Sequence, residues 1–475
     1  MDTKKLRQKI LDLAIHGKLV PQDPNDEPAS VLLERIRAEK ERLIKEGKIK
    51  RSKKSASDTP HYENEVLFEV PESWECCHVS DIFELNPKNN VPDDTQSGFI
   101  PMACVDDGFG YAHSFETRPW GEIRKGYSHF QNGDIGIAKI SPCFENRKST
   151  IFYDLPNGIG AGTTELTVLR GHCVNIEFYL YLFQSEWYIF EGTKEFKGVV
   201  GQQRVNKEIF TTLLIPLPPI EEQNRIVTEI KKWFSLIDTL ETAKEDLQES
   251  IAQAKSKILD LAIHGKLVPQ DPSDEPAIEL LKRINPKFTP CDNAHYENIP
   301  FEIPKSWEWT CMAEVNEYNS ASVDPSKSPD KDFELYSVPA YETGMPEFVK
   351  GKDISSSKKS VSRNDVLLCK INPHLNRAWI VSHYKEDIPC LASSEWIIFR
   401  NSSIIPQYLS FCFTSNYFKE LMLNNVSGVG GSLMRAQPAI VYKYLFPLPP
   451  INEQRRIVSA IQEYYEILDG ISANL

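Results

Sequence analysis

A long exact repeat constrains the fold of this chain more than any other feature. Residues 9–24 recur without a substitution as residues 257–272. Copies about 250 residues apart are too widely spaced for a solenoid, and they indicate two large, related halves. Three shorter segments recur in the same order: HYEN at 61–64 and 295–298, FEVPESWE at 68–75 against FEIPKSWE at 301–308, and PLPPIEEQ at 216–223 against PLPPINEQ at 447–454. The regions between these repeated segments differ in sequence. The two halves therefore share a framework and differ in the regions that it connects.

A regular apolar pattern predicts one long helix over residues 220–263. Its apolar positions follow alternating steps of four and three, the repeat of a coiled coil, and Lys244 is the only interruption. The pair Pro218-Pro219 is a suitable start, and Gly265 is a suitable end. Such a helix is about 60 Å long, at about 1.5 Å per residue. The apolar positions are Ile226, Ile230, Trp233, Ile237, Leu240, Leu247, Ile251, Ala254, Ile258 and Leu261.

The two chain ends carry the pieces of a second helix of the same kind. The C-terminal end repeats the first part of the central pattern, and the N-terminal end repeats its last part. We therefore expect the ends to meet and to form a composite helix antiparallel to the central one. The alternative is two helices that dock independently, each on its own domain. The repeated positions are Ile451, Ile457, Ile461, Tyr464, Leu468 and Ile471 at one end, and Leu6, Ile10 and Leu13 at the other.

The regions between the repeats have the pattern of mixed α/β domains. Short β-rich runs at 135–140 and 366–371 predict strands, and bulky apolar residues at 178–190 and 408–421 predict a helix near the end of each region. We interpret the aromatic residues of these helices as core packing. The predicted domains are a helical region with a basic linker (1–60), a first variable domain (61–218), a central helical region (219–284), a second variable domain (285–449) and a C-terminal helix (450–475).

Composition limits the possible functions. The net charge of −13 argues against an indiscriminate nucleic-acid binder, although residues 1–60 are net positive, so a DNA-binding face must be a local patch. The basic linker at 48–54 could contact phosphates or could simply be solvated. The ten cysteines lack the spacing of a zinc site and fit a reducing cytoplasm, where we expect the protein to act. No apolar run approaches a membrane span.

The doubled signature LPPIEEQ (217–223) and LPPINEQ (448–454) ends each variable region and opens a heptad helix. With this signature the chain resembles, over essentially its whole length, the specificity subunit of type I restriction-modification systems. The resemblance implies two mixed α+β target-recognition domains, related by a pseudo-two-fold axis and joined by long antiparallel coiled-coil helices. Each domain would read one half of a bipartite DNA target, while the helices fix the unread spacer.

The resemblance also implies partners. Two modification subunits would bind the helical regions and methylate adenine, and restriction subunits would translocate and cleave double-stranded DNA. S-adenosylmethionine, ATP and Mg are expected on those subunits, and no cofactor or metal is expected on this chain. The candidate partner contacts are Ile226, Ile230, Trp233, Ile237, Leu240, Ile457, Ile461 and Tyr464.

The best candidates for DNA contact are residues that the repeat makes equivalent. Residues 133–142 align with 364–373, and in each a lysine ends the predicted strand, where it could meet a phosphate or pair with a local carboxylate. The loops that follow hold arginine, which reads guanine, and asparagine, which reads adenine. This first group of candidates is Lys139, Asn146, Arg147 and Lys148 in one domain, and Lys370, Asn372, His374, Asn376 and Arg377 in the other.

A glycine-rich loop after each apolar helix supplies a second group, Gln202, Gln203 and Arg204 in one domain and Ser432 and Arg435 in the other. Glycine permits close approach to DNA, although such a loop could also be a simple turn into the last strand. Glu165 and Glu395 also recur, and we expect a hydrogen-bonded structural role for them. His16 and His264 precede helix-ending glycines, where capping is expected rather than catalysis.

Several catalytic motifs are missing from the sequence. It has no phosphate-binding loop of the GxxxxGKS/T kind, no adenine-methyltransferase NPPY/F motif and no nucleophile elbow. We therefore expect a protein that is not catalytic by itself. Two alternatives stay open: a coiled-coil scaffold that presents two protein-binding α/β modules, and an enzyme with an unrecognised site, for which Asp106-Asp107 is weak evidence.

Overall fold

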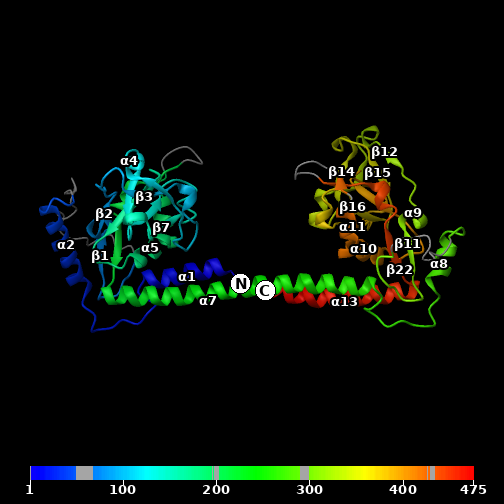
Figure 1. Ribbon diagram of the computed structural model, residues 1–475, viewed down its shortest axis with the longest axis horizontal. Helices are drawn as coiled ribbons and strands as arrows, with labels where there is room; N and C mark the ends of the chain where they lie inside the picture. The colour runs from blue at the N-terminus through cyan, green and yellow to red at the C-terminus, as the bar shows by residue number, and fades with distance from the viewer. Residues whose placement is uncertain are drawn as a thin grey trace. The chain divides into compact units, whose positions relative to one another are not determined.

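The computed structural model describes residues 2–49, 68–194, 196, 203–288, 299–424, 426–427 and 434–475. The chain forms two compact units, Met1–Ala243 and Lys244–Leu475. The boundary falls within helix α7 (Ile220–Ile263), whose 44 residues have the bounds that the apolar pattern predicts (Figure 1).

The first unit combines helices with short strands. Its body is a pair of four-stranded sheets, with strand orders β2-β9-β6-β7 and β4-β3-β8-β5. Strands β1 and β10 pair separately, from Glu75 opposite Leu217 to His78 opposite Leu214, and so join the two ends of the variable region. The elements are α1 (Thr3–Ile15), α2 (Ala29–Lys45), β1 (Glu75–His78), α3 (Val79–Ile82), β2 (Phe83–Leu85), β3 (Gln96–Ile100), β4 (Glu116–Pro119), α4 (Trp120–Ile123), β5 (Ser128–Gln131), β6 (Ile135–Ala138), β7 (Ser149–Ile151), β8 (Ile159–Gly162), β9 (Leu166–Gly171), α5 (Ile176–Gln184), α6 (Glu186–Thr193) and β10 (Leu214–Leu217).

The second unit repeats this plan. Its sheets have the orders β17-β16-β19 and β12-β15-β18-β13-β14, and β11 pairs with β22 as β1 pairs with β10. The parallel pair β13–β18 matches the parallel pair β3–β8 of the first unit. The elements are α8 (Ala277–Ile284), β11 (Glu308–Cys311), α9 (Met312–Val315), β12 (Ser322–Val323), β13 (Asp332–Tyr336), β14 (Glu347–Lys350), β15 (Lys358–Val361), β16 (Val366–Cys369), β17 (Ala378–Ile380), β18 (Cys390–Ala392), β19 (Trp396–Phe399), α10 (Pro406–Thr414), α11 (Asn416–Asn424), β20 (Val426–Ser427), β21 (Arg435–Ala436), α12 (Pro438–Val441), β22 (Leu445–Leu448) and α13 (Ile451–Ala473).

These elements confirm the predicted mixture of helix and sheet, with two sheet-rich domains and one long helix. The predicted apolar helix of each domain is wrong in one respect, because a serine divides it. Ser185 ends α5 and accepts a hydrogen bond from the Tyr188 N–H at 3.2 Å, and Ser415 accepts one from the Phe418 N–H at 3.3 Å. A serine at an N-cap starts a new helix although the apolar pattern continues past it.

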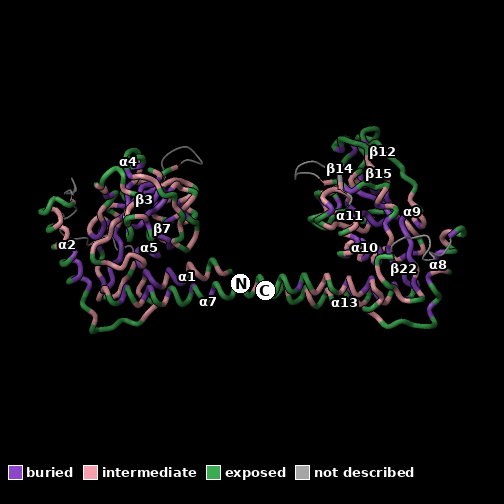
Figure 2. The backbone as a smooth tube through the Cα atoms, viewed as in Figure 1, coloured by how far each residue is buried: buried purple, intermediate pink, exposed green. Residues whose placement is uncertain are grey.

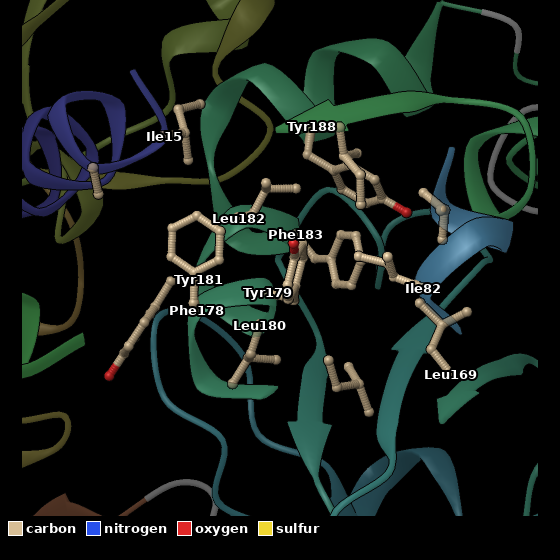
Figure 3. Packing of buried hydrophobic residues seen from close by; sticks show 14 of the residues in the cluster. Ile15, Ile82, Leu169, Phe178, Tyr179, Leu180, Tyr181, Leu182, Phe183 and Tyr188 are labelled. Atoms are coloured by element: carbon tan, nitrogen blue, oxygen red, sulfur yellow. The ribbon is translucent and has the colours of Figure 1, made fainter. Parts of the chain in front are cut away.

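Buried side chains fill the sheet-rich domains of both units, as the purple segments of Figure 2 show. Helix α5 lies at the centre of the first unit. All of its residues from Phe178 to Gln184 are buried. Figure 3 shows its aromatic rings between Ile15 of α1 and Leu169 of β9. A helix that is apolar on all sides must be covered on all sides, which confirms core packing for the aromatic residues of α5. Phe190 of α6 is an exception, because 59% of it is exposed.

Each unit packs a terminal helix antiparallel on its part of α7. In the first unit, Arg7 of α1 donates to Glu241, while Gln22, later in the chain, contacts Glu222, earlier in α7. In the second unit, the Tyr465 hydroxyl of α13 donates to the Lys255 carbonyl at 3.2 Å. The predicted antiparallel pairing is thus present within each unit. That the chain ends meet in one composite helix stays a prediction.

Candidate nucleic-acid interface

The two strand-end lysines occupy equivalent positions. The Lys139 N–H donates to the Glu165 carbonyl at 2.9 Å, and the Lys139 carbonyl accepts from the Val205 N–H at 3.0 Å. In the second domain, the Lys370 N–H donates to the Glu395 carbonyl at 3.0 Å. Each lysine therefore lies between the start of one strand (β9 or β19) and the segment that follows the glycine-rich loop, as the repeat predicts.

Each glutamate beside these lysines holds an arginine. Arg204 donates to Glu165 through Nε at 2.9 Å and Nη2 at 2.7 Å. Arg435 contacts Glu395 in the same fork geometry, at 3.4 and 3.3 Å. The hydrogen bond from Arg204 lowers the pKa of Glu165, and the nearby charge of Lys139 adds to the effect. The expected structural role of both glutamates is confirmed.

The two arginines are held at the surface. About half of each side chain is exposed, 54% for Arg204 and 50% for Arg435. Lys370 is more enclosed, because its Nζ donates to the Ser394 carbonyl at 2.8 Å and lies 3.9 Å from Glu395. Local carboxylate pairing, the alternative considered for these lysines, is therefore present for Lys370. We define the Lys-Glu-Arg cluster as Lys139, Glu165 and Arg204 in the first domain, and Lys370, Glu395 and Arg435 in the second.

Two candidate base readers instead have structural roles. Arg147 (φ 60°) and Asn376 (φ 50°) both take the left-handed backbone conformation in equivalent loops. Arg147 Nε donates to the Gln184 carbonyl at the end of α5, at 3.0 Å, and Asn376 Nδ2 donates to the Thr414 carbonyl at the end of α10. Burial lowers the pKa of Arg147. These side chains anchor their loops to a helix end, and a role for either of them in reading a base stays a prediction.

The neighbouring cations are also largely covered. Lys148 pairs with Asp107 at 3.2 Å and is 16% exposed. Arg377 is 10% exposed, donates to the Ile371 carbonyl at 3.3 Å and lies 3.8 Å from Glu342. These ion pairs cover most of both side chains, and direct DNA contact by Lys148 and Arg377 stays a prediction.

The remaining candidates lie at the surface. Asn146 and His374 are exposed, and Gln203 and Asn372 are partly exposed. The Gln203 carbonyl accepts from the Ser141 N–H at 2.8 Å, which places Gln203 beside the strand-end loop. Gln202 and Ser432 lie outside the described residues, as does most of the basic linker.

The repeated segments also form a buried, hydrogen-bonded joint that the sequence did not predict. Glu222 accepts hydrogen bonds from Trp74 Nε1 at 2.9 Å and from Gln22 Nε2 at 2.6 Å. Burial raises the pKa of Glu222, against the effect of these two bonds. In the second unit Trp307 and Gln270 contact Glu453 in the same way. The exact repeat, the Ser-Trp segment and the Pro-Pro signature therefore meet at one carboxylate in each unit.

The glutamine of the signature completes this joint. Gln223 donates to the Pro218 carbonyl at 2.8 Å and accepts from the Asn175 N–H, just before α5, at 2.8 Å. Gln454 bonds equivalently to Pro449 and Ile405. Their recurrence was visible in the sequence, but Asn175 and Ile405 are 48 and 49 residues away from them, so no spacing rule could identify these partners.

The repeated histidines cap helices. Nδ1 of His16 lies 2.7 Å from the Asp12 carbonyl, and Nδ1 of His264 lies 2.7 Å from the Asp260 carbonyl. Each ring also packs on a phenylalanine, with centroids 4.2 Å apart in the first unit and 3.9 Å in the second. These contacts agree with the predicted structural role.

The candidate partner contacts divide into two groups. Trp233, Leu240 and Tyr464 are exposed, by 41%, 50% and 47%. Leu236 of α7 and Ile467 of α13, which were not among the candidates, are also exposed, by 49% and 56%. The other five are buried within their own units, so they stabilise the core and offer no surface to a partner. These five are Ile226, Ile230, Ile237, Ile457 and Ile461.

Within the described part of the chain, no group of three or more His, Cys, Asp or Glu side chains is arranged to hold a metal ion. None of the described helices is both long and apolar enough to cross a membrane.

Comparison with known proteins agrees with this architecture. The family model of the type I restriction modification DNA specificity domain matches residues 71–249. The chain is 35% identical to the type I restriction enzyme EcoEI specificity subunit of Escherichia coli, over 99% of this chain and 90% of that one. It is 36% identical to the EcoAI specificity subunit of Escherichia coli, over 97% and 88%.

Two solved structures share the fold. One, from a study of complex assembly in a type I restriction-modification system, has a TM-score of 0.59 at 17% identity and covers 86% of this chain and 94% of its own. The crystal structure of the HsdS subunit from Thermoanaerobacter tengcongensis has a TM-score of 0.50 at 15% identity, with 86% and 93% covered. The chain belongs to the family of type I restriction enzyme specificity subunits.

Proposed function

We propose that this chain is the DNA sequence-recognition subunit of a type I restriction-modification complex, and that each recognition domain reads one half of a bipartite target. The observation that carries the proposal is the Lys-Glu-Arg cluster, built twice on matching strand registers. In each domain a bridge joins the residue after the lysine to the arginine, Ile140 to Arg204 and Ile371 to Arg435. The cluster is the same in both domains, which suits binding to the DNA backbone, since the backbone is common to every target. The loops beside it differ, which suits two different base sequences.

The proposal assigns different tasks to the cluster and to the loops beside it. Cations at a sheet edge meet phosphates and fix the register on the duplex, without reading sequence. Exposed polar side chains beside these cations can reach base edges, and the side chains differ between the two domains. Asn146 and Gln203 stand in the first domain, and Asn372 and His374 in the second. Two such sets would select two different half-sites.

We propose the same domain limits that the repeat suggests, with variable domains at 61–218 and 285–449 between framework regions. The pairing of β1 with β10 and of β11 with β22 supports them, because each pair closes a variable region at its base. The framework regions would set the spacer between the half-sites.

The proposed partners are double-stranded DNA, two adenine-methyltransferase subunits and the restriction subunits. The exposed apolar side chains of α7 and α13 would contact the methyltransferase subunits, since exposed apolar patches mark interaction surfaces. S-adenosylmethionine, ATP and Mg would be held by the partner subunits. We place such a complex in the cytoplasm, where it would meet DNA.

A single-molecule methylome of the host, with and without this gene, tests the proposal. We expect a split adenine-methylated motif that disappears when the gene is deleted. A methylome that is unchanged by deletion, from a host that expresses the complex, would contradict DNA recognition. It would favour a scaffold that binds proteins.

A further inference from the structure

The two recognition domains differ at one position beside the Lys-Glu-Arg cluster. Ser128 of β5 stands opposite Gly162 of β8, and Lys359 of β15 stands opposite Ala392 of β18, in matching registers. Ser128 Oγ donates to the Leu166 carbonyl at 3.0 Å. Lys359 Nζ donates to the carbonyl of the residue equivalent to Leu166, Trp396, at 3.1 Å. A lysine therefore replaces a serine at one structural position.

This replacement adds a third cation to the cluster of the second domain. Burial lowers the pKa of Lys359, the positive charge of Lys370 lowers it further, and Glu395 opposes both. Lys370 and Arg435 contact the carboxylate of Glu395, and Lys359 Nζ is held beside them at the carbonyl of the next residue, Trp396. In the first domain only Lys139 and Arg204 are placed around Glu165, among the contacts that the described residues make.

Gathering like charges at a partly buried site costs folding free energy, because each cation disfavours the charged form of the next. A chain that needs only stability gains nothing from such a lysine, since serine fills the same position and satisfies the same carbonyl. Local costs of this kind are typical of functional sites. A DNA phosphate would offset the cost, because it brings negative charge to the cluster.

We propose that Lys359 contacts a DNA phosphate in the second recognition domain, and that the first domain has no equivalent contact. The two domains would then hold the DNA backbone with unequal electrostatic strength. This inference rests on the proposed function, and it names the chemical group, a backbone phosphate, that the site would bind.

The test is Lys359→Ser, which installs the residue of the first domain. The specificity subunit is assembled with its modification subunits, and binding to a duplex that carries the methylated motif is measured over a range of salt concentrations. Loss of one phosphate contact should reduce the slope of log K against log salt by about 1. The affinity should fall by the same factor on duplexes with an altered motif, because a phosphate contact does not read sequence. The thermal stability of the complex should stay the same or rise. An unchanged slope, or a loss of stability, would overturn the inference.

Two further variants sharpen the test. Lys358→Ser is the matched control, because successive side chains of a strand point to opposite faces, and Lys358 Nζ donates to Ser356 at 2.6 and 3.0 Å. Lys358→Ser should keep the wild-type slope. If it reduces the slope as much as Lys359→Ser does, DNA binds a general basic surface, and the assignment to Lys359 is overturned. Ser128→Lys should increase the slope by about 1, and no increase would contradict the equivalence of the two positions.

The same data separate this inference from the proposed function. If the wild-type complex binds the motif duplex no better than a scrambled duplex, DNA recognition itself fails, and the inference fails with it. If the wild-type complex discriminates between the duplexes but Lys359→Ser keeps the wild-type slope, only the inference fails.

Discussion

At the scale of single residues, the structure requires a glycine at the same place in each exact repeat. Gly17 has φ +64°, and a Cβ at this position would lie 2.4 Å from Cγ of Pro71. Gly265 has φ +65°, and its Cβ would lie 2.3 Å from Cγ of Pro304. The glycine thus permits a turn and a close contact between two repeated segments.

Gly17→Ala should lower the free energy of unfolding of the full chain by about 2–4 kcal/mol, because left-handed strain and a clash add together. Gly47→Ala is the matched control, since Gly47 has φ +73° and its Cβ would meet nothing within 4 Å. It should cost about 1–2 kcal/mol. Urea denaturation of both variants measures the difference, and equal losses would contradict a role for the Pro71 contact.

Adjacent residues in the strand-end loop should separate stability from recognition. Arg147→Ala removes the hydrogen bond to the end of α5 and should cost about 2 kcal/mol of stability, because a charged donor is lost. It should leave the methylated motif unchanged. Asn146→Ala, at an exposed side chain, should keep stability within about 0.5 kcal/mol and weaken or alter methylation. Denaturation and methylome sequencing test the pair, and the reverse pattern would show that Arg147 reads DNA.

At the scale of elements, ion pairs hold the N-terminal helix on α7. Arg7 donates to both carboxylate oxygens of Glu241, at 2.8 and 2.9 Å, and also pairs with Asp238. The hydrogen bond from Arg7 is the largest cause that lowers the pKa of Glu241, from 4.5 to about 2. The pair is the polar part of an interface whose apolar part is Ile10 and Leu11.

This lowered pKa predicts how the docking of α1 depends on pH. A carboxyl with a lower pKa in the folded state stabilises the fold above its unfolded pKa, and this contribution is lost as pH falls toward the folded value. The wild-type chain should therefore lose thermal stability between pH 4.5 and about 2 more steeply than Glu241→Gln. Melting temperatures of both chains across this range measure the effect. Parallel curves would show that the pair contributes nothing to docking.

The sequence predicted the bounds of helices better than it predicted side-chain contacts between distant residues. The bounds of α7 followed from heptad spacing and from the prolines and the glycine at its ends, because these signals are local. The division at Ser185 was missed, since a buried serine cap is hidden within an apolar run. The role of Arg147 was also missed, because its acceptor lies 37 residues away at the end of α5.

At the scale of the whole molecule, repetition keeps the framework constant and leaves the loops to vary. The same carboxylate joint, strand registers and Lys-Glu-Arg cluster occur in both units. The net charge of −13 coexists with these local groups of cations, as expected for a protein that binds DNA through patches rather than through its total charge. Different segments of the chain therefore form the helical framework and the recognition surfaces.

If each recognition domain reads its own half-site, exchanging one domain should change only one half of the methylated motif. Residues 285–449 would be replaced by the corresponding region of another specificity subunit of this family, and the methylome of the host would be sequenced. We expect a motif in which one half and the spacer are retained while the other half is new. A methylated motif in which both halves change, or in which neither changes, would contradict this expectation.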